Sequence, residues 1–181
     1  MTTNIWQRDK VCLRAMEPSD WSVFHTNDED TEVARLCYEI PFPRSTVGTM
    51  KWAEHTAATP PQDDCYRLVI ENRGGEVVGA LNTFECNRRC GTFKYGLAVL
   101  RPHWRNGYAS AAIRLLLRYY FEELRYQKVT VHVYDFNDAS IQLHRKLGFQ
   151  EEGRLRRMIY TGGRHHDEIL LGLTAEEFAG L

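Results

Sequence analysis

A ten-residue stretch, "RPHWRNGYAS" (residues 101–110), combines small residues with positive charge between an apolar run and a helical pattern. A helix that begins after a strand has backbone N–H groups without intrahelical partners, and its dipole favours an anion there. Gly107 and Ala109 would let a phosphate approach those N–H groups, while Arg101 and Arg105 would add charge at the mouth. The stretch therefore predicts a cradle for a pyrophosphate, although a helix start whose small residues serve only packing would look the same.

The common nucleotide motifs do not account for this turn. The pattern G-x-x-x-x-G-K-[ST] is absent, which argues against a Walker-type enzyme, and G-x-G-x-x-G is absent, which argues against a dinucleotide fold. A second segment, "NDASIQLHRKLGF" (residues 137–149), opens the next helical pattern directly after the neighbouring strand pattern. Two such motifs in this order and context are more specific than either one alone.

Together, "HWRNGYA" and "NDASIQLHRKLGF" resemble the two central motifs of the GNAT superfamily of N-acetyltransferases, and the resemblance covers roughly residues 11–173. The start "LRAMEPSDW" and the tail from "LGFQEEGRLRRM" onward resemble the branch of ribosomal-protein alanine N-acetyltransferases. The first motif corresponds to the family's [QR]-x-x-G-x-[GA] loop, with Trp104 where Gln or Arg is usual. The resemblance implies acetyl-CoA as the acetyl-donor cosubstrate, no metal, and a cofactor-binding set of Leu97, Ala98, Val99, Trp104, Arg105, Asn106, Gly107, Tyr108, Ala109, Ser110, Asn137 and Ser140.

The resemblance also implies direct transfer of acetyl to a primary amine through a tetrahedral intermediate. Backbone N–H groups of residues 97–99 would polarise the thioester carbonyl and stabilise the oxyanion. His144 stands where the family often has a Tyr as general acid, so it would protonate the leaving thiolate; otherwise it is a surface histidine. Glu85 is the leading candidate for the general base and Asp135 a weaker one, although an exposed strand-end carboxylate would give the same sequence at Glu85.

The amine acceptor is expected to lie against the two N-terminal helical patterns and "EIPFPRS" (residues 39–45). The segment "DEDTE" places four acids within residues 28–32, and Glu39 follows. Negative charge there would favour a cationic amine. A protein N-terminus, a polyamine and an aminoglycoside all fit this description, and the sequence does not choose among them.

The elements that must position these residues follow from periodicity. Strand patterns cover residues 11–16, 66–72, 77–86, 92–100, 128–134, 154–160 and 167–173, and helical patterns cover 18–28, 45–58, about 108–124, 138–147 and 174–178. Gly79 and Gly96 inside strand patterns predict a bulge or a close backbone approach. The order predicts one domain (residues 1–181) of the α/β (α+β) class, with a mixed, mostly antiparallel sheet flanked by helices and a central parallel β-α-β crossover.

Composition sets the broad class. The 181 residues are 43% hydrophobic and 26% charged, with a formal net charge of -1, as in an ordinary globular domain. The apolar runs are too short to span a bilayer, and the N-terminus lacks the apolar core of a signal peptide. Five scattered cysteines suit a reducing compartment, and Cys86 and Cys90 alone do not make a zinc site. We therefore expect a cytoplasmic protein, monomeric or homodimeric, without a metal.

Two other functions compete with acetyl transfer. One is a non-catalytic module that binds CoA but has lost the chemistry. The other is nucleic-acid binding by the basic window (residues 86–121), which holds seven Lys or Arg residues and no acid, with Trp104 and Tyr108 as stacking groups. The near-zero net charge and the second motif argue against nucleic acid as a partner.

Overall fold

The computed structural model describes residues 4–37 and 40–180 of the chain. Among them, eight strands form one sheet in the order β1–β2–β3–β4–β5–β6–β8–β7. Neighbouring strands are antiparallel except for β5 and β6, which are parallel. The strands are β1 (Gln7–Arg8), β2 (Val11–Arg14), β3 (Arg67–Asn72), β4 (Val77–Asn87), β5 (Thr92–Val99), β6 (Lys128–Tyr134), β7 (Gln150–Thr161) and β8 (Arg164–Thr174).

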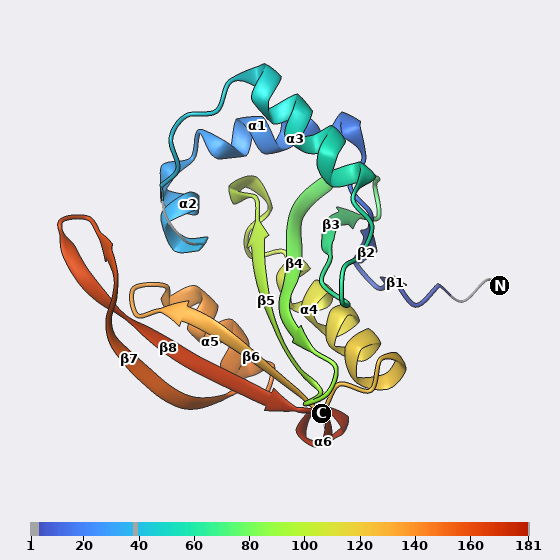
Figure 1. Ribbon diagram of the computed structural model, residues 1–181, viewed down its shortest axis with the longest axis vertical. Coiled ribbons are helices and arrows are strands. Elements are labelled where there is room, and N and C mark those ends of the chain that lie inside the picture. The colour runs from blue at the N-terminus through green and yellow to red at the C-terminus, as the bar shows by residue number, and fades with distance from the viewer. Residues whose placement is uncertain (1–3, 38–39, 181) are drawn as a thin grey trace.

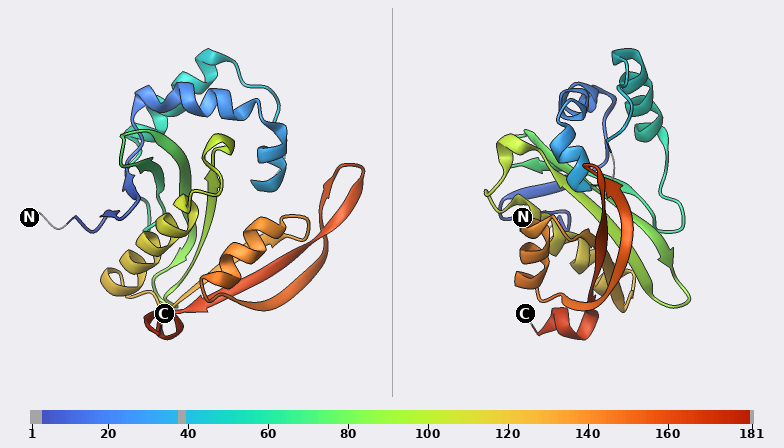
Figure 2. Two further views of the ribbon diagram at one scale, coloured as in Figure 1. Left: turned by 180° about the vertical axis from the view of Figure 1, so that it is seen from behind. Right: turned by 90° about the vertical axis from the view of Figure 1, so that its left-hand side faces the viewer.

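The helices cover both faces of this sheet (Figures 1 and 2). One apolar cluster joins the sheet to α4 and α5, and a second joins its other face to α1 and α3. The helices are α1 (Trp21–Asp28), α2 (Thr31–Cys37), α3 (Thr46–Ala58), α4 (Tyr108–Arg118), α5 (Asp138–Lys146) and α6 (Ala175–Ala179), with short 3-10 turns at Pro18–Asp20 and Arg101–His103 and a π turn at Tyr119–Glu123. The predicted fold class, including the parallel crossover from β5 through α4 to β6, is confirmed.

The parallel pair opens into a wedge. Pairing between β5 and β6 runs from Thr92 opposite Lys128 to Lys94 opposite Thr130 and, within the described residues, stops there. Beyond Lys94 the two strands diverge, and α2 lies beyond the open end (Figure 1). The backbone edge of β5 that faces away from β4 is therefore not covered by a neighbouring strand along residues 97–99.

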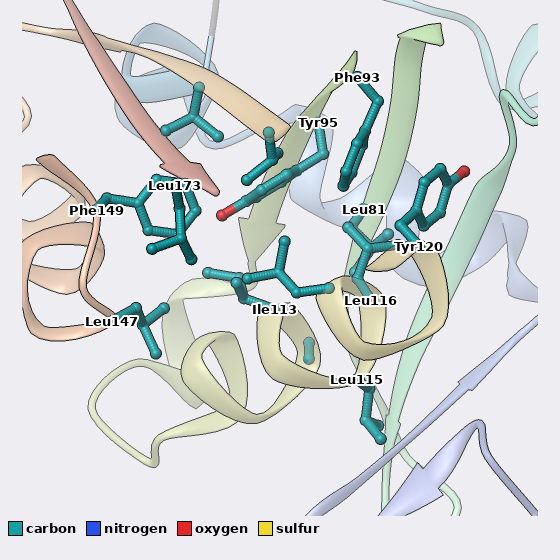
Figure 3. Close-up of a cluster of buried hydrophobic side chains, with 14 of the residues drawn as sticks. Leu81, Phe93, Tyr95, Ile113, Leu115, Leu116, Tyr120, Leu147, Phe149 and Leu173 are labelled. Atoms are coloured by element: carbon teal, nitrogen blue, oxygen red, sulfur yellow. The ribbon is translucent and has the colours of Figure 1, made fainter. Parts of the chain in front are cut away.

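The core explains why α4 lies against the sheet. Ala112, Ile113 and Leu116 of α4 are fully buried, at 0% exposure, and pack with Leu81 and Phe93 of the sheet. Figure 3 shows Ile113 and Leu116 of the helix facing Leu81 and Phe93 of the strands. The helical spacing of apolar residues in this segment is what fixes the helix face that meets the sheet.

Two features differ from the sequence prediction or make it specific. Helix α2 was not predicted from the sequence. Its cap is Asp30, whose Oδ1 accepts the N–H of Val33 at 3.2 Å. From the sequence, Asp30 had been assigned only to the acidic segment (residues 28–32). The predicted close approach at Gly79 is confirmed, because a Cβ there would overlap the carbonyl oxygen of Ala98. The absence of a side chain at Gly79 therefore lets β4 approach closely the part of β5 that borders the wedge.

Candidate active site

A cavity of about 440 Å³ lies at the open end of the wedge, between β5, the turn before α4, the start of α5, and α2. We call it the first cavity. It is lined by eleven of the twelve residues that the sequence assigned to the cofactor: Leu97, Ala98, Val99, Trp104, Arg105, Gly107, Tyr108, Ala109, Ser110, Asn137 and Ser140. Residues from three separate segments, up to 43 positions apart, thus line one cavity.

The turn before α4 has the geometry of an anion cradle. Gly107 is the N-cap of α4 with a φ of 81°, in the left-handed region, and no side chain caps the helix. The first intrahelical bond runs from the Ala111 N–H to the Gly107 carbonyl, so the N–H groups of residues 108–110 have no partner within the helix. Arg105 also has a positive φ, 64°, and lines the cavity. The turn is therefore bent twice where an anion would meet the helix N-terminus.

Lys10 adds a charge that the sequence did not point to. Its Nζ donates to the Asn106 carbonyl at 3.0 Å and lies 3.4 Å from the position that a Cβ on Gly107 would take. Lys10 precedes β2 and lies 96 positions before Asn106, so spacing within the motif gave no signal for it. Asn106 itself, the twelfth predicted residue, holds the turn instead, because its Nδ2 donates to the His103 carbonyl at 3.2 Å.

Trp104 and Arg101 brace the same turn. The indole Nε1–H of Trp104 donates to the Val99 carbonyl at 2.7 Å, and the Arg101 guanidinium lies 4.9 Å from the centre of that ring. Arg101 also forms an ion pair with Asp30 of the α2 N-terminus, which lowers the pKa of Asp30 to about 2. Arg101 is thus committed to a protein carboxylate, and the expectation that it adds free charge at the mouth is corrected. Trp104, in place of the usual Gln or Arg, anchors the turn to β5.

Asn137 links α5 to α2 across the cavity. Its Oδ1 accepts the Ser140 N–H at 3.1 Å, as expected of an N-cap, and its Nδ2 donates to the Leu36 carbonyl at 3.1 Å. Both halves of the side-chain amide are therefore used within the protein. The wall of the first cavity is held in place by this bond on one side and by Arg101–Asp30 on the other.

The direction of the N–H groups along β5 follows from one hydrogen bond. The Leu100 N–H donates to the Val78 carbonyl at 2.9 Å, and in an antiparallel ladder alternate residues face the partner strand. The N–H groups of Leu97 and Val99 consequently point away from β4, into the open wedge. The Val99 carbonyl, which Trp104 reaches from that side, fits this alternation.

A second cavity, of about 460 Å³, lies on the α1 and α3 side of the sheet. Its floor includes small or polar residues of β4 and β5, and its walls include Phe24, Asp28, Arg44, Trp52 and Arg67. Four residues line both cavities, and we call this shared stretch the junction: Val33, Cys37, Leu97 and Ala98. The two cavities therefore meet where the outward N–H of Leu97 lies.

His144 lies in the core instead of the first cavity. It is 5% exposed; its Nδ1 is 2.8 Å from the Ser140 carbonyl oxygen, and its Nε2 is 2.9 Å from the Tyr95 hydroxyl. Because a carbonyl only accepts, Nδ1 carries the hydrogen, and Nε2 accepts from Tyr95. Tyr95 extends from β5 toward Phe149 in Figure 3, and burial lowers the pKa of His144. The pair fills the base of the wedge, and the expectation of a surface histidine is corrected.

Replacing His144 by Phe tests whether this side chain donates a proton or supports the fold. We expect turnover within about threefold of wild type, and a loss of about 1–3 kcal/mol in the free energy of unfolding at pH 7.5, because the Tyr95 hydroxyl loses its acceptor. The lowered pKa means that the unfolded chain protonates first, so wild-type stability falls as the pH drops below about 6.5. The stability gap between wild type and variant should therefore narrow in urea titrations at pH 5.5. A turnover loss of about 100-fold with unchanged stability would instead identify a proton donor.

The carboxylates proposed as bases are not at the junction. Glu85 lies near the far end of β4, where its Oε2 pairs with Lys94 at 2.7 Å, four positions past Leu81, the partner of Leu97. Glu85, the leading candidate for the general base, therefore lies away from the place where the amine would be deprotonated. Asp135 accepts from His166, with Oδ1 and Nδ1 2.9 Å apart, and lines neither cavity.

The basic window is largely neutralised by acids from outside it. Arg88 pairs with Asp64, Lys94 with Glu85, Arg101 with Asp30 and Arg118 with Glu122. Trp104 is fixed by its bond to Val99, and Tyr108 faces the first cavity. Four of the seven cations are thus committed to protein carboxylates, which weakens the case for a nucleic-acid surface.

Comparison with known proteins decides the family. Residues 10–150 match the acetyltransferase (GNAT) domain. The chain belongs to the GNAT acetyltransferase family. It is 40% identical over 178 residues to YokL of Bacillus subtilis (strain 168), an SPbeta prophage-derived uncharacterized N-acetyltransferase, with 98% of this chain and 97% of that protein covered. This GNAT protein is accordingly an acetyl-CoA-dependent N-acetyltransferase, as the two motifs predicted.

Other similarities of this GNAT chain are more distant. It is 31% identical over 99 residues to the ribosomal N-acetyltransferase-like protein YdaF of B. subtilis, covering 55% of this chain and 52% of that one. Its fold matches the spermidine N-acetyltransferase of Vibrio cholerae in complex with CoA and spermine, with a TM-score of 0.81, 22% identity, and coverage of 93% and 98% of the two chains. Among the described helices of this GNAT chain, none has the length and apolar character of a transmembrane span, and within the same residues no group of His, Cys, Asp or Glu side chains is arranged to hold a metal ion.

Proposed function

We propose that this GNAT protein transfers the acetyl group of acetyl-CoA directly to a primary amine at the junction of the two cavities. The observation that carries the proposal is the meeting of these cavities at Leu97 and Ala98, beside the outward N–H of Leu97. Acetyl-CoA would occupy the first cavity and the amine the second. Each substrate would then reach the same stretch of β5 from its own side.

The first cavity suits CoA in two ways. The free N–H groups of residues 108–110, together with Arg105 and Lys10, would bind the pyrophosphate. The open edge of β5 would accept the pantetheine arm much as it would accept a neighbouring strand. The thioester would thereby arrive at the junction.

The chemistry at the junction needs few side chains. The Leu97 N–H would stabilise the oxyanion that forms when the amine attacks the thioester carbon. The C–N bond forms, the C–S bond breaks, and the amine proton leaves to solvent, while a thiol of pKa about 8.5 departs readily. Only the neutral amine attacks, so we expect the rate to rise with pH through the pKa of the acceptor.

A covalent route through Cys37 is the chemical alternative, since this thiol lines both cavities. Desolvation raises the pKa of Cys37, which keeps it as the protonated thiol, and a thiol is a poor nucleophile. We therefore expect Cys37→Ala to retain turnover within about threefold of wild type, measured as thiol release from acetyl-CoA. A loss of 100-fold or more would favour an acetyl-cysteine intermediate.

The decisive experiment for the proposed function has two steps. Acetyl-CoA at about 100 times its Kd should stabilise the protein by about 2.7 kcal/mol in thermal unfolding, and an oligonucleotide should not. A panel of primary amines is then assayed for thiol release and for the mass of the acetylated product. Binding of acetyl-CoA without acetylation of any amine would show the non-catalytic module.

A further inference from the structure

The second cavity carries more positive than negative charge. Among the described residues that line it, the charged side chains are Arg44, Arg67 and Asp28. The carboxylate of Asp28 lies 4.0 Å from the guanidinium of Arg44 and forms an ion pair with it. Arg67 forms no ion pair or hydrogen bond with any side chain in the described part of the chain.

The acidic segment that predicted a cationic acceptor is used elsewhere. Asp30 pairs with Arg101, and Glu32 lies 3.7 Å from Arg35. Of residues 28–32, Asp28 lines the second cavity, while Glu39 lies outside the described residues. Most of the negative charge that was expected at the acceptor is therefore paired with neighbouring arginines.

Aromatic contacts hold the two arginines in place. The guanidinium carbons of Arg44 and Arg67 lie 5.2 and 5.6 Å from the centre of the Trp52 ring, which Phe24 supports edge-on at 5.5 Å. Burial, and the proximity of Arg44, lower the pKa of Arg67, while the Asp28 carboxylate acts more weakly in the opposite direction. Two cations of like sign in a half-buried site repel each other, and an anion between them would relieve that repulsion.

Arg67 is also aligned with the junction. It is the cross-strand partner of Asn82, which is the partner of Gly96 on β5, so the three residues share one face of the sheet. Two strand spacings separate Arg67 from Gly96, which is about 10 Å between backbones. An extended chain covers about 3.5 Å per residue, so an acceptor of about three residues would span the full distance between the backbones, and a shorter acceptor would span what the Arg67 side chain leaves. Gly96 and Ala98 have little or no side chain, so the floor of the second cavity is open between Arg67 and the junction.

We propose that the acceptor bears a carboxylate, which Arg67 binds while the amine reaches the junction. The inference rests on the proposed function and deepens it: the substrate is an amine with an acidic group a short distance away, as in an amino acid or a short peptide, and not a polyamine. A guanidinium fixed over an aromatic ring presents its N–H groups to a carboxylate in a defined plane. Asn82 would add a neutral hydrogen-bonding group beside it.

Matched acceptors test the carboxylate with the amine held constant. Alanylalanine and its C-terminal amide differ only at the far end, free alanine tests the single amino acid, and spermidine tests the polyamine. A second matched pair, the amidated dipeptides of alanine with aspartate and with asparagine, asks whether a side-chain carboxylate serves as well. We expect kcat/KM at least tenfold higher for each carboxylate than for its amide, and higher for alanylalanine than for spermidine.

Variants then assign the preference to Arg67. Arg67→Met should raise the KM for alanylalanine at least tenfold and leave the KM for its amide and the KM for acetyl-CoA within about threefold. The preference for the carboxylate over the amide should therefore disappear. Arg67→Lys should restore part of it, and Arg89→Met, on the exposed β4–β5 turn, should change nothing. The inference would be overturned, and the proposed function would stand, if the wild type preferred the amide or spermidine, or if the preference for the carboxylate survived in Arg67→Met. If no acceptor releases thiol although acetyl-CoA binds, the proposed function fails as well.

Discussion

Gly107→Asp is expected to weaken acetyl-CoA binding at least about 100-fold, equivalent to about 2.8 kcal/mol. Gly107 is the N-cap of α4, next to the free N–H groups of the first turn. A carboxylate at this position would repel a phosphate and would also compete for Lys10, whose Nζ lies 3.4 Å from the new Cβ. Titration calorimetry with acetyl-CoA measures the effect directly.

Gly107→Asn is the matched control. Asn has nearly the same shape as Asp and shares its tolerance of the left-handed φ of 81° that this position requires. Strain and bulk therefore cancel between the two variants, and their difference reports charge. Equal affinities of the Asp and Asn variants for acetyl-CoA would show that the pyrophosphate does not bind at this turn.

Leu97→Pro is expected to lower kcat about 100- to 1,000-fold, because proline removes the N–H that faces the junction. This N–H is not part of the β4–β5 ladder, so the strand pairing can survive its loss, as at edge positions where proline is found. The affinity for acetyl-CoA should stay within a few-fold of wild type, since the pyrophosphate cradle keeps the free N–H groups of residues 108–110. Single-turnover rates with a fixed amine give the comparison.

Leu97→Ala separates the backbone from the side chain. It removes the same packing against the core as the proline variant but keeps the N–H. We expect its kcat within about fivefold of wild type, with both variants checked for folding by circular dichroism. If the alanine and proline variants lose turnover equally, the backbone N–H of Leu97 is not the group that stabilises the oxyanion.

The sequence predicted those parts of the site that lie in continuous motifs. Gly107 and Ala109 mark the turn, Asn137 marks the start of α5, and apolar periodicity placed the helix behind them. Eleven of the twelve predicted residues meet around one cavity because β5 and β6 are neighbours, which the parallel crossover required. For these residues, both the local structure and the strand order could be predicted from the sequence.

Contacts between segments that are far apart in the chain could not be predicted from the sequence in the same way. Nothing in the spacing indicates that Lys10 reaches the turn, that Asp30 pairs with Arg101, or that Arg67 lies opposite Asn82. His144 had the right position in its motif, but its neighbour Tyr95 comes from another strand and decides its environment. The acceptor side depends on such contacts throughout, because it is assembled from α1, α2, α3 and three strands.

A single-turnover experiment tests the central claim of direct transfer at the junction. Enzyme in excess of acetyl-CoA is mixed rapidly with alanylalanine, and thiol release, acetylated dipeptide and intact protein mass are followed together. Direct transfer predicts that thiol and product appear with one rate constant and that the protein never carries an acetyl group. Acetylated protein that precedes the product, or thiol release without acetylated dipeptide, would contradict the account.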